Sequence, residues 1–154
     1  MSVDVHLTMI KIMPVSREDL PELKALILEE FPYTKPKIEG IMKRQGRAGV
    51  FLLKAVEGGR LAGFIDFQVE GFQAMIVGLS VRNVLRRQGI AKKLVIEALK
   101  ACIEKGVIEV KLVVRQDNKP AVRLYESFGF ESSGVLPKKI AGQAVQEMAL
   151  RLAV

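Results

Sequence analysis

The strongest constraint on the fold is a series of three β-prone runs separated only by short turns. These runs cover Val50–Val56, Leu61–Val69 and Gln73–Val81. Gly58-Gly59, between the first two, is a two-residue hairpin signal because both glycines tolerate a positive φ. Strands joined this closely pair antiparallel. The middle of the chain therefore predicts an antiparallel meander.

Helical and extended patterns alternate outside this meander. Ser16, with Asp19 three residues later, is typical of a helix start, and Pro32 ends that helix. The other expected elements are a strand at Leu7–Met13, helices at Pro36–Gln45 and from about Gly89 to Lys105, a strand at Val107–Val114, a helix capped by Asn118, and strands at Phe130–Leu136 and Ala144–Leu152. We expect one domain over residues 1–154 with an α+β (α/β) fold: a mixed, mostly antiparallel sheet of six to seven strands flanked by about four helices.

The residue types present exclude several classes of site. One cysteine, Cys102, excludes an internal disulfide and a cysteine-cluster zinc site, and one histidine, His6, excludes a two-histidine metal site. No apolar run approaches the roughly 20 residues that a membrane helix needs. Residues 1–4 do not resemble a signal peptide. We therefore expect a cytoplasmic protein without a metal and without a membrane partner.

The charge distribution predicts an anionic ligand. Lys and Arg exceed Asp and Glu by 24 to 17, which gives a net charge of +7. The segment between Glu70 and Glu97 has no acidic residue, and its basic residues are Arg82, Arg86, Arg87, Lys92 and Lys93. Nucleic acid would require aromatic side chains that stack on bases, but none lies between Phe72 and Tyr125. A phosphate-bearing small molecule is therefore favoured over nucleic acid.

A loop inside this basic segment could bind the phosphates. Arg86-Arg87-Gln88-Gly89-Ile90-Ala91 lies between an expected strand and the start of an expected helix. Free N–H groups at a helix N-terminus bind anions, and the small Gly89 and Ala91 let a pyrophosphate approach the backbone. Neither the Walker pattern nor the G-x-G-x-x-G pattern is present, so an ordinary solvated loop is the alternative.

Two segments resemble the hallmarks of the GNAT superfamily of N-acetyltransferases. Arg86-x-x-Gly89-x-Ala91 matches the pattern Q/R-x-x-G-x-G/A, and Asn118–Phe130 is similar to N-x-x-A-x-x-L-Y-x-x-x-G-F. The expected order of strands and helices also resembles that of the family over nearly the whole chain. The final segment and Phe31-Pro32 look most like the branch that acetylates protein N-termini, including the ribosomal-protein alanine acetyltransferases.

The resemblance implies acetyl-coenzyme A (acetyl-CoA) as the acetyl donor and a primary amine as the acceptor, either a protein N-terminal α-amine or a small-molecule amine. The pyrophosphate would bind the backbone of the signature loop, and the pantetheine would pair with the preceding strand, where Gly78 could form a bulge that opens the strand edge. The cofactor-binding residues implied in this way are Leu79, Ser80, Val81, Arg86, Arg87, Gln88, Gly89, Ile90, Ala91, Lys92 and Asn118.

The resemblance also assigns the general acid. Tyr125 occupies the family's usual acid position, where a phenol protonates the leaving thiolate; its structural alternative is a core aromatic residue. The resemblance does not identify the general base, because Val113 and Gln73 stand where relatives carry glutamate. Glu70, Asp66 and a backbone carbonyl with an ordered water are the alternatives.

Two other functions stay open at this point. Without a glutamate at position 113 or 73, the chain could be a catalytically idle acyl-CoA-binding or sensor domain. The net charge of +7 leaves a basic nucleic-acid-binding domain as a weaker alternative. The sequence does not specify the amine, and the final strands could pair between two subunits of a homodimer.

Overall fold

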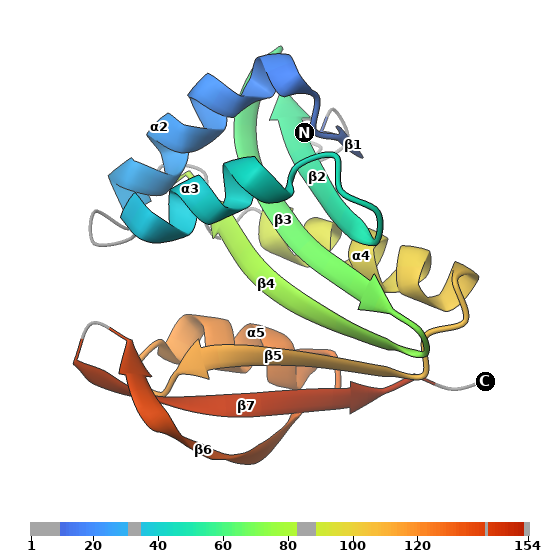
Figure 1. Ribbon diagram of the computed structural model, residues 1–154, viewed down its shortest axis with the longest axis vertical. Helices are drawn as coiled ribbons and strands as arrows, with labels where there is room; N and C mark the ends of the chain where they lie inside the picture. Colours follow the sequence, from blue (N-terminus) through green and yellow to red (C-terminus); the bar gives the residue numbers. More distant parts are fainter. Residues whose placement is uncertain (1–9, 31–34, 83–88, 141, 153–154) are drawn as a thin grey trace, which may run out of the picture. The chain divides into compact units, whose positions relative to one another are not determined.

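The computed structural model describes residues 10–30, 35–82, 89–140 and 142–152 (Figure 1). They form a seven-stranded sheet in the order β1-β2-β3-β4-β5-β7-β6. The chain divides into two compact units. The N-terminal unit comprises the chain up to Phe67 together with Gly78–Lys100, and the C-terminal unit comprises Gln68–Val77 and the chain from Ala101 onward. The single domain over residues 1–154 stays a prediction.

The observed elements confirm the predicted fold class. The strands are β1 (Lys11–Pro14), β2 (Val50–Glu57), β3 (Arg60–Glu70), β4 (Gln73–Val81), β5 (Glu109–Arg115), β6 (Glu131–Ile140) and β7 (Gln143–Arg151). The helical elements are η1 (Arg17–Asp19), α2 (Leu20–Glu30), α3 (Lys35–Arg44), α4 (Ile90–Glu104) and α5 (Lys119–Ser127). The expected strand residues 7–9 and the Phe31-Pro32 pair lie outside the described residues. No helix in the described ranges has both the length and the apolar character needed to cross a bilayer.

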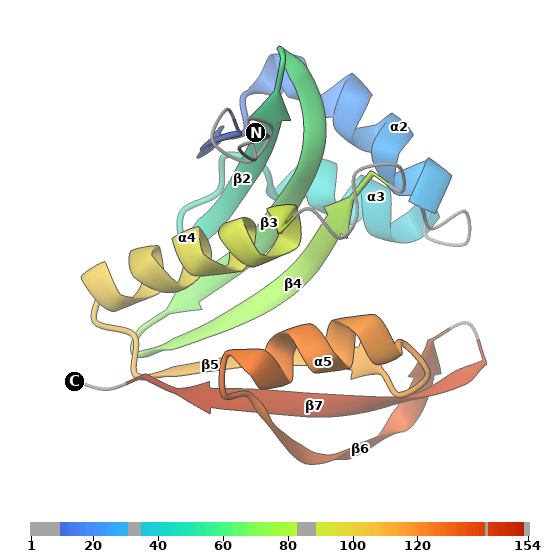
Figure 2. The same ribbon diagram turned by 180° about the vertical axis from the view of Figure 1, so that it is seen from behind.

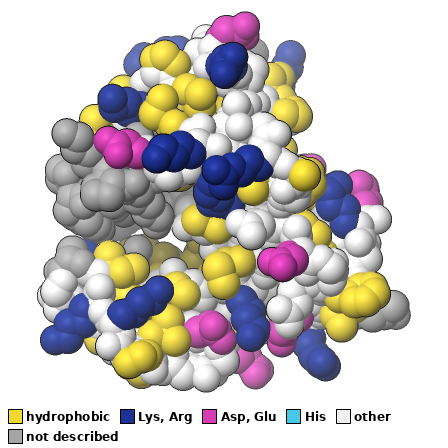
Figure 3. Space-filling model, in the orientation of Figure 1, with side chains coloured by type: hydrophobic (Ala, Val, Ile, Leu, Met, Phe, Trp, Pro, Cys, Tyr) yellow, Lys and Arg dark blue, Asp and Glu magenta, His cyan; other side chains and the backbone are white. Residues whose placement is uncertain are grey.

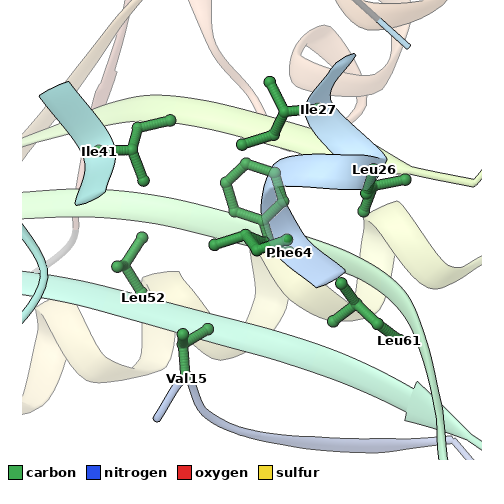
Figure 4. Packing of buried hydrophobic residues seen from close by; sticks show 8 residues of the cluster. Val15, Leu26, Ile27, Ile41, Leu52, Leu61 and Phe64 are labelled. Atoms are coloured by element: carbon green, nitrogen blue, oxygen red, sulfur yellow. The ribbon is translucent and has the colours of Figure 1, made fainter. Parts of the chain in front are cut away.

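In the N-terminal unit, helices cover both faces of the strands. Helices α2 and α3 lie on one face of β2 and β3, and α4 lies on the other (Figures 1 and 2). Between α2, α3 and the sheet, Phe64 of β3 is surrounded by apolar side chains from both helices and from β2 (Figure 4). The cluster comprises Val15, Leu23, Leu26, Ile27, Ile41, Leu52, Leu61 and Phe64. Burial of such side chains is the main favourable term in folding.

The predicted helix start at Ser16 is confirmed, and Lys54 reinforces it. The Ser16 backbone N–H donates to Asp19 Oδ2 at 2.7 Å, and Lys54 Nζ of β2 donates to both carboxylate oxygens of Asp19 at 2.8 Å. Burial opposes ionisation of Asp19, but the bonds from Lys54 and Ser16 outweigh it and lower the pKa of the carboxyl below its usual value. The charged carboxylate therefore joins the start of the first helix to β2.

The C-terminal unit contains a parallel pairing, as the predicted mixed sheet requires. The first part of β4 pairs with β5 in parallel, from Gln73↔Glu109 to Ile76↔Leu112. Strand β5 then pairs antiparallel with β7, and β7 with β6. Helix α5 covers one face of β5 and β7 (Figure 2). Val110, Leu112 and Val114 of β5 alternate along the strand and are buried.

Two glycines on neighbouring strands differ in how much space surrounds them. A Cβ atom on Gly63 would lie 2.6 Å from the carbonyl oxygen of Ser80, which is closer than any real Cβ contact. A Cβ atom on Gly78 would meet the Phe64 ring at 3.9 Å and Asp66 Cβ at 4.0 Å, which is ordinary contact. The required glycine is therefore Gly63, which sequence reasoning did not single out. The bulge expected at Gly78 stays a prediction.

These glycines make a matched pair for a stability measurement. We expect Gly63→Ala to lower the free energy of unfolding by about 1–3 kcal/mol, because the methyl group would push against the backbone of β4. Gly78→Ala should lower it by less, because its methyl group fits the existing space. Urea denaturation of both variants and of the wild type measures the difference. Equal stability of the two variants would contradict the observed close approach of β3 and β4 at Gly63.

Candidate functional site

The C-terminal end of β4 contains three of the predicted cofactor-binding residues. Ser80 and Val81 are buried, and Leu79 is half-buried. The Ser80 hydroxyl is buried without a hydrogen-bond partner among the described residues. A buried hydroxyl without a partner costs about 1–3 kcal/mol, so such groups often mark a place where a ligand or water binds. Ser80 therefore fits a strand that binds a polar chain such as pantetheine.

Arg82, directly after β4, makes contacts that the sequence did not predict. Its Nε atom donates to the carbonyl oxygen of Leu61 at 2.6 Å. Its terminal nitrogens lie 4.0 Å from Glu22 and 3.6 Å from Glu29 of α2. The segment between Glu70 and Glu97 contains no acidic residue of its own, but α2 brings two carboxylates to Arg82. Arg82 anchors the end of β4 to β3 and α2.

The start of α4 presents backbone donors. Gly89 has a φ of 77°, a left-handed conformation that favours glycine. The first backbone bond of the helix runs from Lys93 N to Gly89 O at 3.0 Å, so the N–H groups of Ile90, Ala91 and Lys92 precede the helical ladder. The first turn contains no acidic side chain, and the Lys92 side chain is exposed. This geometry suits an anion.

Three predicted cofactor-binding residues, Arg86, Arg87 and Gln88, lie outside the described residues. The residues described around them, Leu79–Val81 and Gly89–Lys92, belong to the N-terminal unit, whereas Asn118 and Tyr125 belong to the C-terminal unit. The structure thus brings the end of β4 and the start of α4 into one unit, and it places Asn118 and Tyr125 in the other unit. All of these ligand contacts stay predictions.

Asn118 is the N-cap of α5, as the sequence predicts. Its side-chain oxygen Oδ1 accepts a bond from the Ala121 N–H at 3.3 Å, and Pro120 occupies the first turn. The oxygen therefore satisfies a free donor of the helix. The amide NH₂ group of the same side chain is not used in the cap, which leaves a donor that suits a cofactor oxygen.

Tyr125 lies in the apolar interior of the C-terminal unit. It is 6% exposed, and its ring meets Phe130 edge-to-face with centroids 5.6 Å apart. Burial raises the pKa of the phenol well above its usual value. The hydroxyl therefore stays protonated at neutral pH, and its role as the general acid stays a prediction.

The candidate bases lie in very different surroundings. Asp66 is fully buried and forms an ion pair with Arg44 of α3 at 2.8 Å. Glu70 is exposed at the end of β3. Gln73 donates to Glu109 at 3.3 Å. Val113 lies on β5 directly opposite Glu147 of β7, a carboxylate that sequence reasoning missed. Only the pairing of β5 with β7 reveals Glu147, and no local signal in the sequence identifies it.

Among the described residues, no group of three or more His, Cys, Asp or Glu side chains is arranged to hold a metal ion. The chemistry that the described side chains offer is proton transfer and hydrogen bonding. Tyr125 can donate a proton, carboxylates such as Glu147 can accept one, and the start of α4 can bind an anion. Tyr125 and Glu147 belong to the C-terminal unit, and the start of α4 belongs to the N-terminal unit.

Residues 20–130 match the Acetyltransferase (GNAT) family, so the chain belongs to this family. The match includes both segments that resemble the family's hallmarks and all of the predicted site residues. The predicted resemblance is therefore confirmed.

Several proteins of this family are similar to the chain. The mycothiol acetyltransferase of Clavibacter michiganensis subsp. michiganensis is 36% identical over 86 residues, which are 56% of this chain and 28% of the relative. The ribosomal-protein-S18-alanine N-acetyltransferase from Escherichia coli has a TM-score of 0.80 at 25% identity over 95% of this chain and 96% of that chain. The PaiA N-acetyltransferase from Thermoplasma acidophilum, in complex with coenzyme A, has a TM-score of 0.70 at 22% identity over 90% of this chain and 97% of that chain. The chain spans between 25% and 62% of the length of the first curated relatives that it matches.

Asn118 allows the helix cap to be separated from ligand binding. Asn118→Asp keeps an oxygen that can accept from Ala121 N–H but removes the NH₂ donor, whereas Asn118→Ala removes both. We expect Asn118→Ala to cost about 0.5–2 kcal/mol of stability, and Asn118→Asp to stay near the wild-type stability. Both variants should bind acetyl-CoA more weakly in calorimetric titration. Wild-type affinity in Asn118→Asp would contradict a contact between this amide and the cofactor.

Proposed function

We propose that this protein is an N-acetyltransferase that transfers an acetyl group from acetyl-CoA directly to a primary amine. The observation that carries the proposal is the start of α4, where backbone donors without an acidic side chain in the first turn follow the buried end of β4. Membership of the Acetyltransferase (GNAT) family supports the same activity. The similar fold of an N-acetyltransferase solved with coenzyme A supports the choice of carrier.

We assign the cofactor-binding roles to backbone and small residues. The N–H groups of Ile90, Ala91 and Lys92 would bind the pyrophosphate, helped by the partial positive charge of the helix N-terminus. Leu79, Ser80 and Val81 would pair with the pantetheine, and the Ser80 hydroxyl would gain a hydrogen-bond partner. The acetyl thioester, when bound, supplies an activated carbonyl. The protein must orient it, deprotonate the amine and protonate the sulfur.

The acceptor amine needs to lose a proton before it can attack. An alkylamine with a pKa near 10 is neutral in about one molecule in a thousand at pH 7, whereas an α-amine with a pKa near 8 is neutral in about one in ten. The demand on a base is therefore smaller for a protein N-terminus. The similarity to a ribosomal-protein alanine acetyltransferase supports an N-terminal α-amine as the acceptor, with a small-molecule amine as the alternative.

Two other functions make different predictions. An acyl-CoA sensor would bind acetyl-CoA but release no free thiol with any amine. A nucleic-acid-binding domain would bind DNA or RNA with a steep salt dependence. On the face drawn in Figure 3, the Lys and Arg side chains are dispersed among hydrophobic and acidic ones, which does not favour the nucleic-acid alternative.

Tyr125 provides the test of the transferase proposal. Tyr125→Phe keeps the ring that packs on Phe130 but removes the hydroxyl, so kcat for thiol release should fall about 10²-fold or more. The dissociation constant for acetyl-CoA in calorimetric titration should stay unchanged. The substrates are acetyl-CoA with a panel of peptides that have free N-termini and of small amines.

Ser127→Ala is the matched control. It removes a hydroxyl from the same helix, where it donates to the carbonyl oxygen of Leu124, and it should leave kcat unchanged. Absence of acetyl-CoA binding at millimolar ligand would overturn the proposal for the wild type. Binding without thiol release for any amine would support the sensor instead.

A further inference from the structure

The cofactor-binding roles assigned within the N-terminal unit also give the place of the acyl group, and this inference rests on the proposed function. The diphosphate is assigned to the start of α4, which follows β4 in the chain, and the pantetheine to Leu79–Val81. An extended arm that leaves the diphosphate and runs back along β4 meets Val81 first and Leu79 last. The next residue is Gly78, so the acyl thioester would lie beside this glycine.

Gly78 faces the same side of the sheet as Phe64. A Cβ atom on Gly78 would meet the Phe64 ring at 3.9 Å and Asp66 Cβ at 4.0 Å. A Cβ atom on Gly63 would instead meet the Val81 side chain at 3.1 Å, and successive residues of a strand alternate between the two faces. Val81 therefore points to the opposite face. All of these residues belong to the N-terminal unit.

The missing side chain of Gly78 leaves a space lined by carbon atoms, which we call the Gly78 slot. Its nearest neighbours are two carbon atoms of the Phe64 ring and Asp66 Cβ. The Asp66 carboxylate forms an ion pair with Arg44 at 2.8 Å, so its charge is compensated within α3 and β3. Gly78 itself is half-buried, and a ligand can reach it. An apolar lining favours an alkyl chain over a charged one.

The Phe64 side of the slot is held in place by the core. Phe64 is 2% exposed, and side chains from α2, α3 and β2 surround its ring (Figure 4). A side chain packed in this way cannot move without disturbing its neighbours. The size of the slot is therefore set by the residue at position 78.

A second observation on this face points to a ligand. Ser80 lies two residues after Gly78, so its side chain also points to the Phe64 face. Ser80 is 5% exposed, and its hydroxyl has no hydrogen-bond partner in the described part of the chain. A carbonyl oxygen of the carrier would accept a bond from this hydroxyl. Such a bond would hold the reacting end of the carrier on the face where the slot is open.

We propose that Gly78 determines the specificity for the acyl donor, and that its slot admits short unbranched acyl groups longer than acetyl, such as propionyl. Burial of the added methylene against Phe64 should raise the affinity about fourfold. Propionyl transfer needs no further reactant. The C–N bond forms, the C–S bond breaks, and the proton that the amine nitrogen loses balances the proton that the sulfur gains.

The test is calorimetric titration of the wild type, Gly78→Ala and Gly78→Val with coenzyme A, acetyl-CoA and propionyl-CoA. The wild type should bind propionyl-CoA about fourfold more tightly than acetyl-CoA. In Gly78→Ala the new methyl group takes the place of the added methylene, so both acyl-CoAs should bind alike. In Gly78→Val the slot is overfilled, so propionyl-CoA should bind more weakly than acetyl-CoA, on the order of tenfold.

Two controls separate the slot from a general disturbance of β4. Coenzyme A has no acyl group, so its affinity should be the same in the wild type and in both Gly78 variants. Ser80→Ala removes a hydroxyl from the same face but leaves the slot open. It should weaken acetyl-CoA and propionyl-CoA equally and keep their wild-type ratio.

The outcomes distinguish this inference from the proposed function. The same affinity ratio of propionyl-CoA to acetyl-CoA in the wild type and in both Gly78 variants would overturn the inference. Equal weakening of all three ligands, coenzyme A included, would also overturn it, because the substitutions would then act through the strand. A wild type that binds none of the three ligands, or that binds them but acylates no amine, would instead overturn the proposed function.

Discussion

The proposed binding of acetyl-CoA depends on the backbone donors at the start of α4. A helix cannot satisfy its own first N–H groups, and the aligned peptide dipoles add a partial positive charge there. In this chain the first turn of α4 contains no acidic side chain that could compete for these donors. An anion is therefore favoured at this position by the main chain itself. The cationic side chains nearby can strengthen such binding, but they do not create it.

Several contacts fix the strand that leads toward this helix. Gly63 lets β3 approach the carbonyl of Ser80 closely. Arg82 then bonds the backbone of Leu61 and reaches the carboxylates of α2. Because these contacts involve β3 and α2 as well as β4, the position of the predicted pantetheine strand depends on the packing of the whole N-terminal unit. The charge of Arg82 serves this packing, although the sequence suggested a role in ligand binding.

Sequence reasoning succeeded where the signal is local. Gly58-Gly59, the Ser16–Asp19 pair and the Asn118 cap each depend on residues within a few positions, and all three are observed. It failed where the contact depends on strand register. Gly78 attracted attention as a glycine inside a strand, but Gly63 is the one that a side chain would disrupt. The pairing of Glu147 with Val113 and the register shift at Ser133 are visible only in the sheet. A single sequence specifies neither of them.

The most direct measurement compares the affinity for acetyl-CoA of two glycine variants at opposite ends of α4. Gly89 and Gly106 have φ values of 77° and 79°, so alanine strains the backbone equally at both positions. The account predicts that Gly89→Ala weakens acetyl-CoA binding on the order of tenfold, about 1.4 kcal/mol, because the added methyl group keeps the diphosphate away from the main chain. Gly106→Ala should bind like the wild type. Equal, undiminished affinity in both variants would contradict the account.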